Sequence, residues 1–156
     1  MGSKLEHNDF TGLEVQPNLR LTWLTDSGNT LWGAISRAVR TPARGEHDVS
    51  LMVIPPAPTP PPLTIFGSSA FDSEELVAWE AGYRRAIGES VSVDVTAFYN
   101  DYENLRTTDI YQPAPLEAAF GNNMEGNTQG IEIDAHWRAT PWLSVNANYT
   151  RLEVDL

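Results

Sequence analysis

Apolar residues recur at every second position over long stretches of this chain. The clearest run begins at Val15 and continues through Leu19 and Leu21 to Trp23, with polar or charged residues between them. Such alternation predicts a β-strand with one apolar and one polar face. The strands predicted in this way cover about residues 13–24, 30–41, 75–86, 91–105, 129–138 and 143–154. The sequence therefore predicts an all-β fold, an antiparallel up-and-down meander of about six long strands.

The connections between these strands alternate strictly between short and long. Short polar or Pro/Gly turns follow the first, third and fifth strands, whereas about residues 42–73 and 107–127 form long loops. Residues before about 13 are also expected to be loop. Two such loops are unusual in a compact domain. They are typical of a transmembrane β-barrel, which has tight periplasmic turns and longer extracellular loops. We therefore expect the meander to be part of a larger transmembrane β-barrel.

Strand length and aromatic placement favour the same fold. A tilted strand needs roughly 9 to 11 residues to cross a bilayer, and most of the predicted strands reach that length. Five aromatic residues lie within a few positions of the short turns and are predicted to form an interfacial belt. They are Trp23, Trp32, Tyr83, Trp137 and Trp142. The alternative is that these rings close the bottom of a soluble β-sandwich core.

Composition excludes several other classes. Ten Lys and Arg residues against 21 Asp and Glu residues give a net charge of -11, which argues against a nucleic-acid partner. The absence of cysteine excludes disulfides and thiolate metal sites. No apolar run approaches the roughly 18 residues of a membrane helix, and no signal peptide is visible at the N-terminus. The mean hydropathy of -0.32 does not exclude a membrane barrel, because alternation averages its apolar face with a polar one.

Four motifs resemble the β-barrel of TonB-dependent outer-membrane receptors. They are the hairpin at 15–23 and 30–42, the segment EELVAWEAGYR at 74–84, the strand VTAFYNDYENL at 95–105 and the segment NTQGIEI at 127–133. They follow the family's order, and the resemblance covers roughly residues 13–154. It implies a barrel of about 22 strands around a plug domain. About six strands are too few to close a barrel, so we expect a partial barrel with the plug domain absent.

The resemblance also implies a function. Members of the family carry out active transport of a ferric siderophore, cobalamin or similar bulky nutrient across the bacterial outer membrane. The partners implied are outer-membrane lipid, a small-molecule nutrient ligand and, in the full-length protein, a plug domain and the TonB complex. No cofactor and no nucleic acid is expected. A partial barrel would not be transport-competent alone, and only its two long loops could contact the ligand.

Two charged residues are candidates for the interior of the barrel. Alternation places Arg40 with Ser36 and Ala38 on the polar face, whereas Arg37 falls on the apolar face beyond the membrane. Arg40 is a candidate contact for the plug or an anionic ligand, although pairing with a carboxylate is the favoured interpretation. Glu80 lies on the polar face of its strand and is expected to pair with an arginine of a neighbouring strand or of the plug.

Enzymatic chemistry receives little support. Carboxylates cluster at the loop–strand junctions, where they could act as a glycosidase pair but are explained more simply as an acidic rim. The residues concerned are Asp72, Glu74, Glu75, Asp101 and Glu103. The histidines His7, His47 and His136 have no metal-ligand spacing. We therefore predict that the chain is not an enzyme and holds no metal.

Two further alternatives remain open on the sequence alone. The chain could be a soluble secreted β-sandwich that binds a carbohydrate on Trp79 or Trp32. The proline-rich stretch at 54–63 is expected to be a stiff extracellular loop, although its polyproline geometry would also suit an SH3-type groove.

Overall fold

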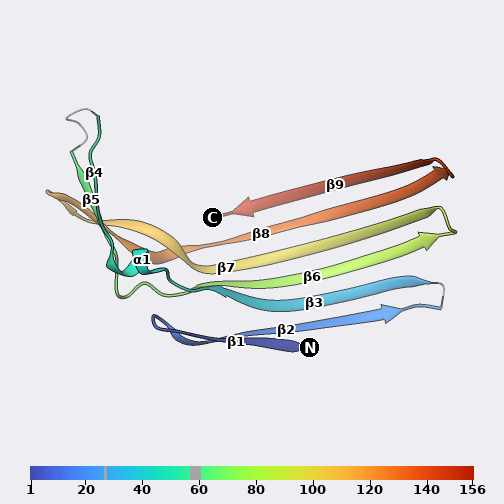
Figure 1. The fold of residues 1–156 in the computed structure, drawn as a ribbon, viewed down its shortest axis with the longest axis horizontal. Helices are drawn as coiled ribbons and strands as arrows, with labels where there is room; N and C mark the ends of the chain where they lie inside the picture. The colour runs from blue at the N-terminus through green and yellow to red at the C-terminus, as the bar shows by residue number, and fades with distance from the viewer. Residues whose placement is uncertain (27, 57–60) are drawn as a thin grey trace.

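The computed structural model describes residues 1–26, 28–56 and 61–156, and these form one long curved sheet (Figure 1). Its elements are β1 Gly2–Asn8, β2 Gly12–Leu24, β3 Asn29–Arg40, α1 Arg44–Asp48, β4 Ser50–Val53, β5 Leu63–Phe66, β6 Glu74–Ile87, β7 Val91–Pro113, β8 Leu116–Thr140 and β9 Leu143–Asp155. The strand order is β1-β2-β3-β6-β7-β8-β5-β4, and β9 also pairs with β8.

The long strands are antiparallel neighbours. β2, β3, β6, β7, β8 and β9 pair one with the next along the chain. Tight connections join them at one end of the sheet, which we name the turn end. There Gly28 adopts φ +77°, a backbone conformation that favours glycine, and its N–H donates to the Thr25 carbonyl at 3.0 Å. The predicted all-β antiparallel meander is confirmed.

The end opposite the turns, which we name the arm end, differs from the expected loops. The interval 107–127 is mostly strand, because β7 and β8 continue as a hairpin beyond the rest of the sheet. Register shifts between Tyr102 and Thr107, with a positive φ at Asn104, interrupt the alternation. A bulge of this kind shifts the side chains that follow it to the opposite face of the sheet. The period-two alternation in the sequence therefore ends before the strand does.

The interval 42–73 also contains elements of its own. α1 is followed by the short strands β4 and β5, and β5 pairs in parallel with Leu116–Ala119 of β8. Figure 1 shows this β4–β5 hairpin projecting beyond the arm end on the side of β8 and β9. At the N-terminus, residues expected to be loop form β1 on the edge of β2. Of the proline-rich stretch, residues 57–60 lie outside the described part of the chain.

Very little of the sheet is covered. Among the described residues, the buried ones are Glu14, Pro42, Glu46, Phe71, Ser73, Gly82 and Ala118, and all except Gly82 and Ala118 gather where the 42–73 segment meets the strands. By contrast Trp23 is 67% exposed and Trp137 is 53% exposed. No helix in the described ranges is long and apolar enough to cross a membrane. Away from the arm end, the described parts of the long strands therefore form a single layer whose two faces both lack a protein covering.

Candidate functional site

One face of the sheet is apolar over most of its length. Hydrogen-bonded pairing aligns its side chains in rows that cross the strands. One such row runs through Trp23, Leu31, Tyr83, Val95, Ile133 and Tyr149. Because none of the described residues forms a second layer on this apolar face, its large side chains remain exposed.

The apolar stretch shifts along the strands from one side of the sheet to the other. In β2 it is centred on Leu19, and in β9 it spans residues 143–149 and is centred at position 146. The row that begins at Leu19 continues through Ile35, Trp79, Tyr99, Gln129 and Glu153. The centre in β9 thus lies seven residues before Glu153, after five strand-to-strand steps.

This shift measures the tilt of the strands against the apolar band. Seven residues correspond to about 23 Å along a strand, and five steps correspond to about 24 Å across the sheet. The strands therefore run at about 45° to the band. Strands of outer-membrane barrels are tilted by about 35–45°, so an apolar band at this angle is what a bilayer would require.

The predicted aromatic belt is divided between the faces. Trp23, Tyr83 and Trp137 lie on the apolar face toward the turn end, and Trp142 is 82% exposed in the turn before β9. Trp32 instead pairs laterally with Thr22 and Gly82 on the opposite face. The Arg20 guanidinium lies 4.2 Å from its ring centroid, and the indole covers Gly82, where a Cβ would overlap it. Trp32 therefore does not share a face with the other rings.

The second face is polar and carries Glu80. Its carboxylate lies 4.0 Å from the Arg20 guanidinium, across β3, and both side chains are more than a third exposed. An ion pair at this distance and exposure contributes only about 0–1 kcal/mol. Glu80 retains most of its capacity to accept further hydrogen bonds from a group placed over this face.

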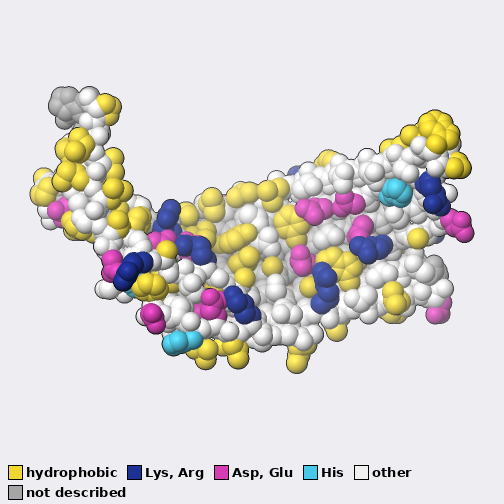
Figure 2. Space-filling view, in the orientation of Figure 1, with side chains coloured by type: hydrophobic (Ala, Val, Ile, Leu, Met, Phe, Trp, Pro, Cys, Tyr) yellow, Lys and Arg dark blue, Asp and Glu magenta, His cyan; other side chains and the backbone are white. Residues whose placement is uncertain are grey.

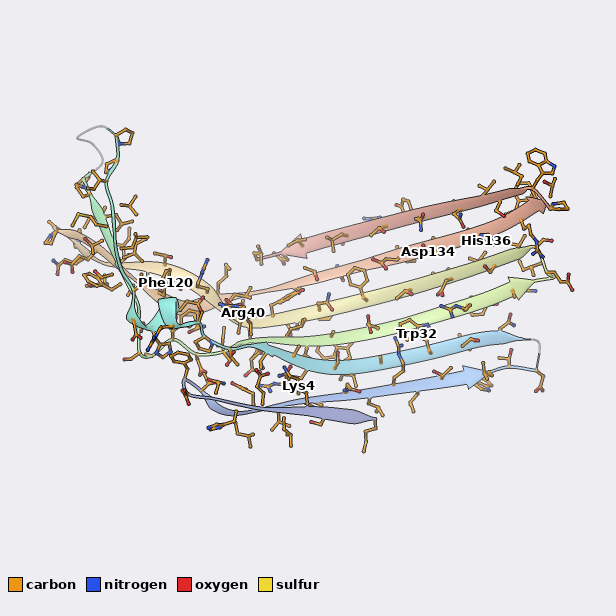
Figure 3. The ribbon with its side chains drawn as sticks, in the orientation of Figure 1. Lys4, Trp32, Arg40, Phe120, Asp134 and His136 are labelled. Atoms are coloured by element: carbon orange, nitrogen blue, oxygen red, sulfur yellow. The ribbon has the colours of Figure 1, made fainter. Side chains whose placement is uncertain are left out.

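A polar cluster lies on the same face toward the turn end. Arg84 pairs with Asp94, Asn148 donates to Asp134, and the ring of His136 lies 2.7 Å from Asn146. These residues line a shallow hollow of about 430 Å³. Figures 2 and 3 show charged side chains gathered here, near Asp134 and His136. Within the described ranges, no group of His, Asp and Glu side chains has the geometry to hold a metal ion.

At the arm end, Arg40 is surrounded by carboxylates. Its guanidinium donates to Glu74 at 2.6 and 2.8 Å and to Glu46 at 2.9 and 3.1 Å. The Arg106 backbone N–H also donates to Glu74, and the Arg106 guanidinium lies 3.5 Å from Glu46. Glu46 in turn accepts from the Ala43 N–H at the start of α1. This network, which we name the arm-end brace, holds the 42–73 segment against β3, β6 and β7.

A second set of contacts extends the brace toward β2. Arg37 pairs with Glu75 at 2.7 Å and donates to the Val15 carbonyl at 2.6 Å. Beside it, Glu14 accepts from the Ser73 hydroxyl at 2.6 Å and from the Thr11 hydroxyl at 2.7 Å. The two arginines singled out by sequence thus have carboxylate partners within the chain.

The environment lowers the pKa of three brace carboxyls. Hydrogen bonds from the Ser73 and Thr11 hydroxyls lower the pKa of Glu14, and the hydrogen bond from Arg40 lowers the pKa of Glu74. Burial raises the pKa of Glu46, but donation from Arg40 and the Ala43 N–H outweighs that effect, so its pKa also lies below the usual range. All three carboxylates are therefore ionised and bound near neutral pH.

The sequence did not indicate most of these partners. Glu14, Glu46, Ser73 and Arg106 come from four different segments, and no local pattern joins them. Ala43 is the N-cap of α1 and Glu46 is the third helical residue. Because Ala is a poor N-cap, nothing in the sequence indicated that a helix starts here. His7, His47 and His136 lie on three separate elements, β1, α1 and β8.

A curved single-layer sheet with a tilted apolar band on one face and a polar opposite face defines this chain as part of a transmembrane β-barrel. Its residues 1–155 match the family model described as TonB dependent receptor-like, beta-barrel. The chain belongs to the TonB-dependent receptor family, whose members are transporters of the bacterial outer membrane and not enzymes.

Solved structures show the same fold at low identity. The siderophore receptor PirA from Pseudomonas aeruginosa matches with a TM-score of 0.84 and 20% identity, over 98% of this chain and 30% of that one. A ferric enterobactin receptor mutant from the same organism, in complex with enterobactin, matches with a TM-score of 0.80 and 20% identity, over 96% of this chain and 24% of that one. The FrpB iron transporter from Neisseria meningitidis matches with a TM-score of 0.66 and 13% identity, over 92% of this chain and 20% of that one. The chain thus spans less than a third of these relatives' length.

Proposed function

We propose that this chain is part of a receptor that takes up a ferric siderophore, cobalamin or a similarly bulky nutrient by active transport across the outer membrane. The observation that carries the proposal is the apolar band, which crosses six strands at about 45° as a bilayer-facing surface must. Siderophore and iron receptors among the structural relatives support the ligand class.

The two faces suggest different partners in the complete receptor. Outer-membrane lipid covers the apolar face, and Trp23, Tyr83, Trp137 and Trp142 lie at the membrane–water interface near the turn end. The polar face contacts a plug domain, with Glu80 as one contact because its single ion pair is long and exposed. The TonB complex acts on that plug. We expect residues 1–156 not to transport unless a plug domain is present.

The arm end is the extracellular side, and the ligand reaches the receptor there. The two sequence-predicted loops, 42–73 and 107–127, are built as a β4–β5 hairpin beside a β7–β8 hairpin. Arg40 is a structural residue in this proposal, because Glu46 and Glu74 already accept its hydrogen bonds. An anionic ligand would have to displace two carboxylates to reach it.

Uptake by the complete receptor tests the proposal. Cells that lack other iron receptors and express this one should accumulate at least one labelled ferric siderophore, or labelled cobalamin, from a panel. Accumulation should be saturable and should stop when the proton-motive force is dissipated. A receptor that is present in the outer membrane but accumulates none of the panel would contradict the proposed ligand class.

A further inference from the structure

Strand β4 is an open sheet edge of an unusual composition. It pairs only with β5 among the described residues, and its four positions are all exposed. Leu51, Met52 and Val53 are 52%, 60% and 45% exposed, and Ile54 just beyond is 71% exposed. Proteins usually protect such edges with charges, prolines or bulges, but Ser50–Val53 contains none of these. Figure 2 shows hydrophobic side chains concentrated on this projecting hairpin.

The register identifies which backbone groups are free. The Gly67 N–H donates to the Val49 carbonyl at 2.7 Å, so this opposed pair is of the hydrogen-bonded type. Such pairs alternate along an antiparallel ladder, and therefore Leu51 and Val53 direct their N–H and C=O groups to β5. Ser50 and Met52 direct theirs to the open side, where a further strand could pair with them.

The position of β4 indicates where such a strand comes from. β8 pairs with β9 along residues 127–140 and with β5 along Leu116–Ala119. β5 and β9 therefore lie on the same edge of β8, one beyond the other along the strand. β4 lies one strand further, on the side toward which the barrel continues beyond β9 (Figure 1). In the relatives, the matched segment belongs to a chain more than three times as long. The polypeptide nearest to the open edge is therefore the neighbouring part of the same receptor.

We propose that the open edge of β4 is the docking site for an extended extracellular segment of the neighbouring part of the same receptor, which adds to β4 as a further strand. The segment pairs its backbone with Ser50 and Met52 and places apolar side chains beside Leu51 and Val53. A charged segment would lose hydration beside this uncharged edge without gaining a partner. The added strand would extend the sheet β7-β8-β5-β4 across the receptor mouth.

This inference rests on the chain being part of a complete barrel, and its test needs neither ligand nor TonB. Amide hydrogen exchange is measured on the complete receptor in detergent micelles. The Ser50 and Met52 amides should exchange as slowly as those of Leu51 and Val53, which bond to β5. Exchange at Ser50 and Met52 that is about tenfold faster or more would show an open edge and overturn the proposal. Protection that disappears on dilution would indicate a second copy and would also overturn it.

A matched pair of variants separates backbone pairing from side-chain packing. Met52→Pro removes an N–H that faces the open side, whereas Met52→Thr keeps it and favours a strand. The proline variant should lose the protection of the Ser50 amide, and the threonine variant should keep it. The Leu63 and Ile65 amides, which face β4, report that the hairpin is still folded. Equal protection in the two variants would contradict docking through the backbone. Because ligand uptake is a separate measurement, its failure would count against the proposed function and not against this site.

Discussion

Single residues determine how closely two strands of this sheet approach each other. A Cβ on Gly130 would overlap the Arg151 backbone carbonyl of β9 and the Phe98 ring, whereas a Cβ on Gly33 would meet only the Glu80 carbonyl at 3.7 Å. Gly130→Ala should therefore destabilise the complete receptor by about 1–3 kcal/mol through overpacking, and Gly33→Ala should be close to neutral. Unfolding by urea in lipid vesicles measures the difference. Equal effects would mean that β8 and β9 separate without strain.

Arg40 is the residue on which most of the arm-end brace converges. Arg40→Ala leaves the buried Glu46 carboxylate without its main donor, which should destabilise the arm end by about 1–3 kcal/mol. Arg44→Ala is the matched control, because Arg44 is 89% exposed and lies 3.7 Å from Asp48. Limited proteolysis of the complete receptor should show faster cleavage within residues 41–73 for the first variant only. Equal cleavage of the two would contradict the role given to Arg40.

Acid should release the same brace. Glu14, Glu46 and Glu74 have folded-state pKa values below their usual range. Their contribution to stability is therefore complete above about pH 4.3 and is lost as the pH falls through the lower folded values. Amide exchange across residues 41–73 should accelerate in that acid range while the membrane strands stay protected. In the variant Glu46→Gln, this exchange should depend less on pH. An unchanged pH dependence would show that Glu46 does not contribute to the acid release of the brace.

At the scale of the elements, each long strand has an apolar face, which we propose contacts lipid, and a polar face, which we propose faces the barrel interior. Ala81 and Ala78 lie on opposite faces of β6, the first on the apolar face and the second on the polar face. Ala81→Arg should oppose insertion by about 2–4 kcal/mol, as expected for Arg facing lipid near the bilayer midplane. Ala78→Arg should be tolerated. Heat-modifiable migration of the receptor from outer membranes reports insertion, and the opposite ranking would reverse the assignment of faces.

Alternation was sufficient to predict the membrane part of these elements. Residues 15–23 of β2, 77–83 of β6 and 143–149 of β9 follow the period-two pattern without interruption, because one face of these stretches must be apolar. The pattern failed where that requirement ends. Beyond Tyr102 the bulges in β7 invert the faces, and β5 is a four-residue strand whose partner lies about fifty residues away. Neither feature leaves a periodic signal.

The candidate site was predictable only in part. Alternation placed Arg40 and Glu80 on the polar face, and pairing with carboxylates was the favoured interpretation for Arg40. The partners Glu46 and Glu74 could not be assigned from the sequence. The position of Glu46 beside Arg40, for example, depends on how the 42–73 segment folds back onto the sheet. Trp32 was grouped with the belt by its nearness to a turn, although its position in the alternation assigns it to the polar face.

For the whole molecule, the uncovered faces and edges predict how the isolated segment behaves. β1 and β9 each pair on one side only among the described residues, and the apolar face is bare. A polypeptide of residues 1–156 should therefore aggregate or associate in water and should require detergent to stay dispersed. Sedimentation with and without detergent tests this. A dispersed folded monomer in water would mean that the apolar face is covered in a way that the sheet does not show.

The parallel pairing of β5 with β8 also constrains the order of assembly. Ile65 can pair with Ala118 only after the whole of β6 and β7 has been synthesised and placed, and such long-range contacts form slowly. The projecting hairpin is therefore among the last parts to form, although it is encoded early. Substitutions in this hairpin therefore affect contacts that form after the long strands have paired in register. The surface of the projecting hairpin is in this way free to diversify during evolution with little risk to the biogenesis of the barrel that carries it.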